Sequence, residues 1–392
     1  PVDRVQQILS GMVRLAEAIE EIRGGVEKID VDSFELLPKG AAQALAEAIT
    51  QGNKIKVLSF CRSGLGAVGA KILAASLPSL VALKVLVLAG DFHSHTNIGD
   101  VGAKDLAASL PALVKLEKLD LSVNDIGDIG AKDLSVSLAH LVNLKELWLR
   151  HNEIGDLGAK DLAACLSALV GLEGLSVDDN HVGDVGAEAL AASLPALKNL
   201  ARLHLNSNQI GDVGAGHLAA SLPALINLKE LWLGYNRIGD VGATALAASL
   251  PALVNLKELY LVNNTIGDSG AKDLAASLLT LPHLAMLALA DNLMGDDGTR
   301  TLIRAGLRSP MRDKQMRVNS NSDSPRLTDY LRCVERWVAV DFKSRVDSFV
   351  ALSVTRANEE NARDKLSSLR ARDSDCAIRQ RVADMLWRPP SF

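Results

Sequence analysis

Large aromatic side chains are scarce in this sequence. Phe, Trp and Tyr make up only 3% of its 392 residues, although apolar residues as a class reach 48%. Ala and Leu must therefore fill the core, which favours many short, similar packing units over one large core built on bulky rings. At about 150 residues per domain, the length predicts two or three domains.

Cysteine and long apolar runs are scarce as well. The four Cys residues form no C-x-x-C pair, which disfavours a disulfide framework and a zinc site and favours a reducing compartment. No apolar run reaches the roughly 18 residues of a membrane span, and the first residues do not resemble a signal peptide. We therefore expect a cytoplasmic protein with no membrane span.

Positive charge is not in excess, because the formal net charge is −5. This disfavours a globally basic nucleic-acid binder, and we expect no nucleic-acid partner. The P-loop, the H-E-x-x-H motif and the G-x-S-x-G motif are all missing. We therefore expect no enzyme, no catalytic residues and no cofactor.

Internal repetition is what the sequence has in abundance. Two earlier units begin at Ile55 and Leu83, the second with five extra residues, and a degenerate unit begins near Val26. The later units open L-x-x-L-x-L/V-x-x-N, and most continue x-I-G-D-x-G-A. Their first Leu recurs every 28 residues, at positions 116, 144, 172, 200, 228, 256 and 284. The sequence therefore predicts about ten repeated units, which we number from this first Leu as position 1.

This pattern resembles the leucine-rich repeat family, specifically its ribonuclease-inhibitor-like class. The resemblance rests on the apolar positions 1, 4 and 6, on Asn at position 9 and on Gly at position 15, and it covers roughly residues 26–308. It implies an α/β fold: a leucine-rich repeat solenoid, or horseshoe, with a parallel sheet on the concave face and helices on the convex face.

The residues of one unit support the same arrangement. The alternation of Leu144, Leu147 and Leu149 predicts a short strand with one face buried, and Leu162 and Leu166 predict one face of a following helix. Neighbouring strands lie about 4.8 Å apart, whereas neighbouring helices need roughly 8–10 Å. An array of such units must therefore curve with its strands on the inside.

Two polar residues recur once in each unit. We interpret Asp156 and its equivalents as N-caps of the helix that begins there. One carboxylate per unit is too few for a ladder of calcium sites. Asn152 and its equivalents are expected to bind turn backbone between neighbouring units and to form a ladder.

The two ends differ from the repeats in composition. An amphipathic pattern predicts an N-terminal helical cap in residues 1–25, before the solenoid of residues 26–308. Residues 309–326 are rich in Ser, Asn, Pro and charge and are interpreted as a linker. Residues 327–392 are interpreted as a C-terminal helical segment.

The C-terminal part is also the basic part of the chain. Residues 310–392 carry 16 Lys and Arg against 12 Asp and Glu, a net charge of +4, which leaves −9 for the remainder. This asymmetry fits a separate module, an intramolecular contact with the acidic array, or a simple cap on the last unit. The role of the segment stays open.

Histidine and cysteine offer weak alternatives for chemistry. His93 and His95 lie in the five-residue insertion, but a metal site would need further ligands and Asp91 is the only local candidate. We interpret this insertion as a solvated loop and expect no metal. Cys165 replaces the Ser that other units carry on their helix and is expected to be packed, while Cys61 lacks the partner groups that a nucleophile needs.

The placement of the aromatic residues is the most informative feature. All four Trp and Tyr residues of the repeats fall at strand positions that are expected to face the concave side: Trp148, Trp232, Tyr235 and Tyr260. Basic residues lie close to them in the pattern: Arg150, His151, Arg202, His204 and Arg237. Aromatic residues and Arg are favoured at protein-binding hot spots. The alternative is ordinary strand propensity with lateral packing between strands.

We therefore expect a non-enzymatic protein–protein interaction scaffold that binds an unidentified partner protein on its concave face. The four aromatic residues would anchor the partner, Arg150, Arg202, His204 and Arg237 would steer it, and His151 would belong to the same binding face. The array also resembles Ran GTPase-activating proteins and the repeat region of intracellular immune receptors. These resemblances imply a GTPase regulator or a sensor or effector fragment as alternatives. The oligomeric state stays open.

Overall fold

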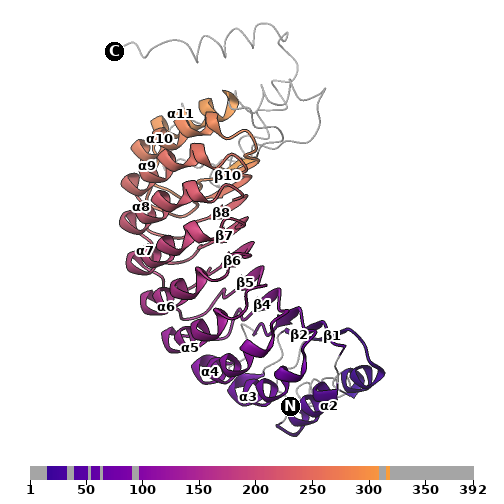
Figure 1. Ribbon diagram of the computed structural model, residues 1–392. Helices are drawn as coiled ribbons and strands as arrows, with labels where there is room; N and C mark the ends of the chain where they lie inside the picture. The colour runs from indigo at the N-terminus through magenta and orange to yellow at the C-terminus, as the bar shows by residue number, and fades with distance from the viewer. Residues whose placement is uncertain are drawn as a thin grey trace, which may run out of the picture.

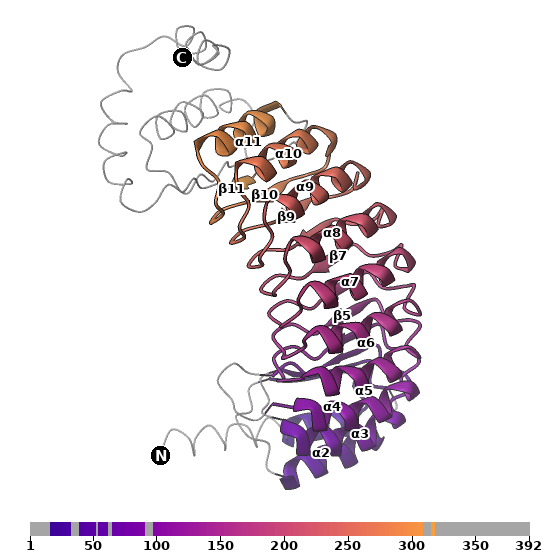
Figure 2. The ribbon, with the colours of Figure 1, turned by 90° about the vertical axis from the view of Figure 1, so that its left-hand side faces the viewer.

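The computed structural model describes residues 16–32, 39–51, 54–61, 65–90, 97–308 and 315–317. These residues form an arc of strand–helix units, with the helices along its outer side and the strands along its inner side (Figure 1). Figure 2 shows the helices stacked one upon another along the arc. The predicted fold of a parallel sheet on the concave face and helices on the convex face is confirmed.

The strands within the described part of the chain form one parallel sheet in sequence order. Strands of successive regular units pair with an offset of one unit, so that Glu146 lies beside Gly174 and Gly174 beside Arg202. Between β3 and β4 the offset from Val85 to Lys118 also spans the inserted residues. The strands are β1 (Lys28–Asp32), β2 (Val57–Cys61), β3 (Val85–Val87), β4 (Lys118–Asp120), β5 (Glu146–Trp148), β6 (Gly174–Ser176), β7 (Arg202–His204), β8 (Glu230–Trp232), β9 (Glu258–Tyr260), β10 (Met286–Ala288) and β11 (Gln315–Arg317).

One helix follows each strand from β1 to β10. Several of these helices end in a 3₁₀ turn, usually at a Leu-Pro-Ala sequence such as Leu194–Ala196. The helices are α2 (Lys39–Gln51), α3 (Gly66–Ser76), α4 (Gly99–Ser109), α5 (Asp128–Leu138), α6 (Asp156–Leu166), α7 (Asp184–Ser193), α8 (Asp212–Ser221), α9 (Asp240–Ser249), α10 (Asp268–Ser277) and α11 (Asp296–Arg308).

Leucine fills the space between sheet and helices. In the unit that begins at Leu144, the side chains of Leu144, Leu147, Leu149 and Ile154 are fully buried. Ala159 on α6 is fully buried as well. Its small side chain allows the close contact between neighbouring helices that the spacing of the strands requires.

The repeated Asp residues cap helices, but not their own. Asp156 is the first residue of α6, and the N-cap position before it is Gly155, which has no side chain. Asp156 Oδ1 instead accepts hydrogen bonds from the backbone N–H groups of Gly183 and Gly186, at 2.7 and 2.8 Å, in the first turn of α7. The expectation that each Asp caps the helix it begins was therefore wrong. The equivalent residues that cap the next helix are Asp100, Asp128, Asp184, Asp212, Asp240 and Asp268.

The predicted ladder of Asn residues between units is confirmed. Asn208 Nδ2 donates to the carbonyl oxygen of Val177 in the preceding unit at 2.9 Å, and Asn208 Oδ1 accepts the N–H of Val182 at 2.9 Å. Asn208 Nδ2 also donates to the carbonyl oxygen of Asn206 in its own turn at 3.0 Å, so the amide satisfies backbone groups of two turns at once. The other members are Asn124, Asn152, Asn180, Asn236, Asn264 and Asn292.

The described ends add one helix and one strand. Residues 16–24 are helical, and Ala18 and Ile22 are buried in the common core. Gln315–Arg317, inside the predicted linker, form β11 beside β10. The first part of the predicted N-terminal cap, the insertion with His93 and His95, most of the linker and the whole segment 327–392 lie outside the described residues. No helix in the described part of the chain is long and apolar enough to cross a membrane.

Candidate functional site

Four rings lie in contact across the concave face of the sheet. Trp148, His204, Trp232 and Tyr260 occupy position 5 of β5, β7, β8 and β9, and we call them the aromatic row. The ring centroids are 5.8 Å apart between Trp148 and His204, 3.8 Å between His204 and Trp232, and 5.0 Å between Trp232 and Tyr260. Parallel pairing without side-chain offset brings these equivalent positions together. The spacing of the repeat predicts this row.

His204 differs from the exposed, steering residue that the sequence predicts. Its ring is 7% exposed and stacks on Trp232 with an angle of 4° between the planes. Burial, together with the positive charges of Arg202 and Arg150, lowers the pKa of His204 to about 4. The ring is therefore neutral at pH 7 and carries no positive charge to attract a partner.

Arg202 is held by groups of its own sheet. It crosses the neighbouring strand β6 above Gly174, and its Nη2 lies 2.8 Å from Glu146 Oε1 in β5. A Cβ atom on Gly174 would lie 3.0 Å from Arg202 Nη2, so the missing side chain leaves room for this crossing. The guanidinium carbon also lies 5.7 Å from the centre of the Trp148 ring.

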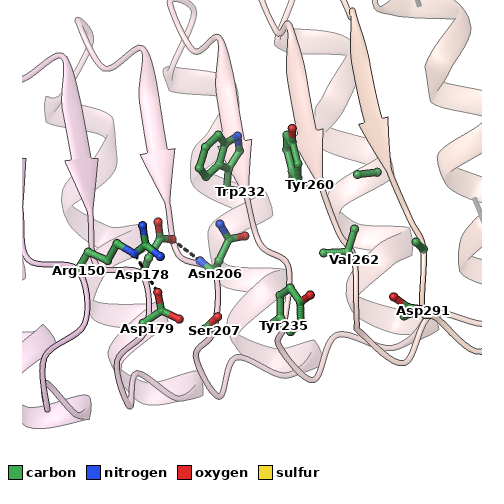
Figure 3. A pocket seen from close by; sticks show the side chains of 12 residues that line it. Arg150, Asp178, Asp179, Asn206, Ser207, Trp232, Tyr235, Tyr260, Val262 and Asp291 are labelled. Carbon is green, nitrogen blue, oxygen red and sulfur yellow. Dashed lines mark hydrogen bonds and ion pairs between the residues drawn. The ribbon is translucent and has the colours of Figure 1, made fainter. Parts of the chain in front are cut away.

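A hollow of about 620 Å³ lies beside the aromatic row (Figure 3). Trp232 and Tyr260 line one side of it and Tyr235 lines another, while Val262, Ala288 and Ala290 contribute small apolar side chains. In the unit that contains β8 and begins at Leu228, position 7 is occupied by Gly234. A Cβ atom there would lie 2.8 Å from Val262 Cγ2 and 3.2 Å from Asn206 Oδ1, two groups that line the hollow.

Polar residues line the opposite end of the hollow. Arg150 Nε lies 3.0 Å from Asp179 Oδ2, and Asp178 Oδ1 accepts the backbone N–H of Asn206 at 2.6 Å (Figure 3). Asn206 Oδ1 in turn accepts the N–H of Gly234 at 2.7 Å. Burial raises the pKa of Asp178 to about 6, although the hydrogen bonds from the Asn206 N–H and the Ser176 hydroxyl act in the opposite direction. Asp178 and Asn206 were not among the predicted binding residues, although both occupy position 7 and so lie on the concave side.

Tyr235 combines exposure with an unfavourable backbone conformation. Its side chain is 54% exposed, and its φ of 54° lies in the left-handed region. Bulky side chains rarely adopt this conformation, whereas Asn and Asp adopt it more readily. The same position carries Asp179, Ser207 and Asn263 in neighbouring units, all with positive φ.

The structure brings only some of the predicted binding residues together. Arg150, Trp232, Tyr235 and Tyr260 line one hollow, and Trp148, Arg202 and His204 lie next to it along the sheet. His151 and Arg237 are exposed but do not line the hollow. Arg237 donates from Nη2 to Gln209 Oε1 at 3.3 Å, in the turns beyond the strands.

Metal and thiol chemistry find little support among the described residues. These residues contain no group of three or more His, Cys, Asp or Glu side chains that could hold a metal ion. Cys165 is buried on α6 and its thiol donates to the carbonyl oxygen of Leu162 at 3.0 Å. Burial raises the pKa of Cys165 to about 12, so the thiolate is strongly disfavoured.

Comparisons with known sequences identify the repeats. A two-copy leucine-rich repeat pattern matches residues 114–164, and a single leucine-rich repeat pattern matches residues 172–191, 196–219, 224–247 and 252–275. None of the curated proteins matches the chain.

Solved structures with similarity include two internalins of Listeria monocytogenes and a TDR receptor. Internalin InlF has 18% sequence identity and a TM-score of 0.43, with 78% of this chain and 89% of that chain covered. The TDR receptor has 17% identity and a TM-score of 0.43, with 78% and 54% covered. Internalin C2 has 25% identity and a TM-score of 0.34, with 54% and 83% covered.

The repeat matches and the arrangement of strands and helices agree with each other. Each matched segment contains one or two of the strands described above and all or most of the helix that follows each strand. The chain carries leucine-rich repeats and folds as a leucine-rich repeat solenoid.

Proposed function

We propose that this protein is a non-enzymatic interaction scaffold that binds a partner protein in the hollow of its concave face. The observation that carries the proposal is the set of three large rings, Trp232, Tyr235 and Tyr260, which line one hollow together with the small side chains of Val262, Ala288 and Ala290. The repeat itself requires none of these residues, because other units carry Ser, Asp, Asn or Ala at the same positions.

The energetics of the site favour binding to a macromolecule. Rings on a rigid sheet lose little conformational entropy when a partner covers them, and they bury a large area. Tyr235 in addition occupies a backbone conformation that Asn or Asp would adopt at lower cost. A costly conformation at an exposed aromatic residue is typical of positions retained for function.

The basic residues take different parts in the proposed site. Arg150 lines the hollow and is oriented by Asp179, so its guanidinium is available at the polar end. Arg202 forms an ion pair with Glu146, and the ring of His204 stacks on Trp232. We therefore place the anchors at Trp232, Tyr235 and Tyr260, extend the surface to Trp148, and assign His151 and Arg237 to its margin.

The test is affinity capture by the intact chain, with partners identified by mass spectrometry and binding then measured with the purified partner. Tyr235→Ala and Trp232→Ala are each expected to weaken binding at least tenfold, as hot-spot rings do. Val241→Ala is the matched control, because Val241 belongs to the same unit but is exposed on the outer side, on α9. Unchanged affinity in both aromatic variants would overturn the proposal.

The 28-residue unit with a full helix in each repeat further supports assignment to the ribonuclease-inhibitor-like class. Within that class, a regulator of GTPases is the competing function. Stimulation of GTP hydrolysis by the purified chain would favour the regulator over a passive scaffold.

A further inference from the structure

On the concave face, two basic side chains of this chain bind one carboxylate. In the tripeptide Glu146-Leu147-Trp148, the carboxylate of Glu146 lies 2.8 Å from Arg202 Nη2 and 3.1 Å from Lys118 Nζ. Both cations also lie within 6 Å of the Trp148 ring centre, Lys118 at 5.8 Å and Arg202 at 5.7 Å. At this place in the sheet, a carboxylate beside an aromatic ring therefore binds basic side chains.

The same tripeptide recurs three units later, and a close variant follows it. Glu230-Leu231-Trp232 forms β8 and Glu258-Leu259-Tyr260 forms β9, with Glu230 directly beside Glu258. Like charges at adjacent positions of neighbouring strands, about 4.8 Å apart, repel each other. In the described part of the chain, Glu258 has no salt bridge, and the only ionisable partner of Glu230 is His204 at 3.0 Å, whose ring is neutral at pH 7.

The pairing register also places Arg202 directly beside Glu230, but its guanidinium forms an ion pair with Glu146 and none with Glu230. Arg202 reaches Glu146 from two strands away because Gly174 lies between them. The residue in register beyond Glu258 is Met286 on β10, which carries no charge. Strands β4 and β7 therefore supply cations to Glu146 from both sides, whereas none of the side chains described in β7, β8 and β10 forms an ion pair with Glu258.

The environments of the two carboxylates differ accordingly. At Glu146, burial acts against ionisation, but Trp148, Lys118 and Arg202 outweigh it and lower the pKa. At Glu258, burial and the charge of Glu230 raise the pKa. The indole N–H of Trp232 lies close enough to oppose this shift, yet Trp232 Nε1 is buried and makes no hydrogen bond of standard geometry with the described residues.

We propose that Glu230 and Glu258, together with Trp232 and Tyr260, bind an Arg or Lys side chain from a basic segment of the partner protein. This rests on the proposed concave-face function and names the chemistry of its partner. The cation neutralises two adjacent carboxylates and lies against an aromatic face, as Arg202 does at Glu146 and Trp148. The neighbouring hollow then takes the rest of the segment.

The test uses the intact chain and a defined probe. A fluorescein-labelled dodecapeptide of alternating Gly and Arg is titrated and followed by anisotropy, beside the same peptide with citrulline in place of Arg. The Arg peptide is expected to bind at least tenfold more tightly, because citrulline keeps the shape and removes the charge. Glu258→Gln is expected to weaken binding of the Arg peptide at least tenfold.

Glu146→Gln is the matched control, because it removes the same charge from the same position of an equivalent tripeptide. It is expected to change the affinity less than twofold, since Glu146 already holds Arg202 and Lys118. Equal losses in the two variants would mean non-specific attraction to an acidic protein and would overturn the proposal. So would equal binding of the citrulline peptide.

Two further outcomes separate this inference from the proposed function. If Trp232→Ala abolishes capture of the protein partner while Glu230→Gln and Glu258→Gln do not, the scaffold function stands and the cation site falls. A carbodiimide cross-link from Glu258 to Lys343 or Lys365 of the same chain, with no peptide binding, would assign the site to the C-terminal segment. That result would overturn binding of an external partner.

Discussion

The imidazole ring of His204 lies flat against the indole of Trp232, with the ring centroids 3.8 Å apart and the planes 4° from parallel. On its edges, His204 Nε2 lies 3.0 Å from Glu230 Oε2, and Nδ1 lies 3.9 Å from Asp178 Oδ2. The buried ring of His204 therefore packs against Trp232. It also lies between Asp178, at the polar end of the hollow, and Glu230, in the proposed cation site.

His204 and Asp178 make opposite contributions to the pH dependence of stability. The pKa of His204 falls from 6.5 to about 4 on folding, so between these values the unfolded chain binds more protons and this contribution to stability rises with pH. The pKa of Asp178 rises from 3.8 to about 6, so the folded chain binds more protons and this contribution falls as pH rises. The two contributions largely cancel between about pH 4 and 6.

Asp178→Asn removes one of these contributions and keeps the acceptor for Asn206. The free energy of unfolding of this variant is expected to rise more steeply than that of the wild type between pH 4.5 and 6, and to exceed it at pH 7. Urea denaturation across this range measures the difference. Parallel pH profiles for the variant and the wild type would contradict the prediction.

Asp184→Ala tests the capping of one unit by the unit before it. The change leaves the N–H groups of Gly211 and Gly214 at the start of α8 without their acceptor. We expect a loss of about 1–2 kcal/mol in the free energy of unfolding. Val185→Ala is the comparison, because Val185 follows Asp184 on α7 and is 59% exposed, and it is expected to cost clearly less. An equal or larger loss for Val185→Ala would refute the inter-unit cap.

Tyr235→Asn separates stability from binding at one residue. Asn tolerates the left-handed backbone better than Tyr, so the variant is expected to be as stable as the wild type or more stable by up to about 1 kcal/mol. Its affinity for the partner is expected to fall at least tenfold, since the exposed ring is lost. Thermal denaturation and binding to the purified partner are measured side by side. Lower stability with unchanged affinity would indicate a structural role for the ring.

Cys165 is expected to be chemically inert in the folded chain. Burial and a pKa of about 12 leave almost no thiolate at pH 8, so iodoacetamide should label Cys165 only after unfolding. Cys61, at the partly exposed end of β2, serves as the comparison. Peptide mapping by mass spectrometry reports both residues separately. Cys165→Ser is expected to be nearly neutral, because Ser193 occupies the equivalent place and donates to Leu190 at 2.7 Å.

The repeat made most of the fold predictable, because the 28-residue spacing from Leu116 onward fixes strand, turn and helix in each regular unit. The role of Asn152 followed from the same logic, since one polar residue per turn must satisfy buried backbone. The role of Asp156 did not follow. Its partners Gly183 and Gly186 belong to the next unit, and only the stacking distance between helices decides which N–H groups a carboxylate reaches.

The candidate site was predictable at the level of faces and less so at the level of contacts. Position 5 indeed lies on the concave side, but large rings on strands about 4.8 Å apart pack against one another, and this buries His204. Gly174 and Gly234 were overlooked, although glycine at an inward strand position signals that a neighbouring group needs the space. Arg202 occupies the space over Gly174, and the side chains of Val262 and Asn206 occupy the space beside Gly234.

At each capped helix, the carboxylate that accepts the first backbone N–H groups belongs to the preceding copy of the repeat. Removing one whole 28-residue copy would join two copies that still present the required acceptor and donors to each other. Duplicating a copy would do the same. Recombination between near-identical segments of the gene can therefore shorten or lengthen this protein without creating an uncapped helix. The length of the concave sheet can then change in evolution by whole repeats.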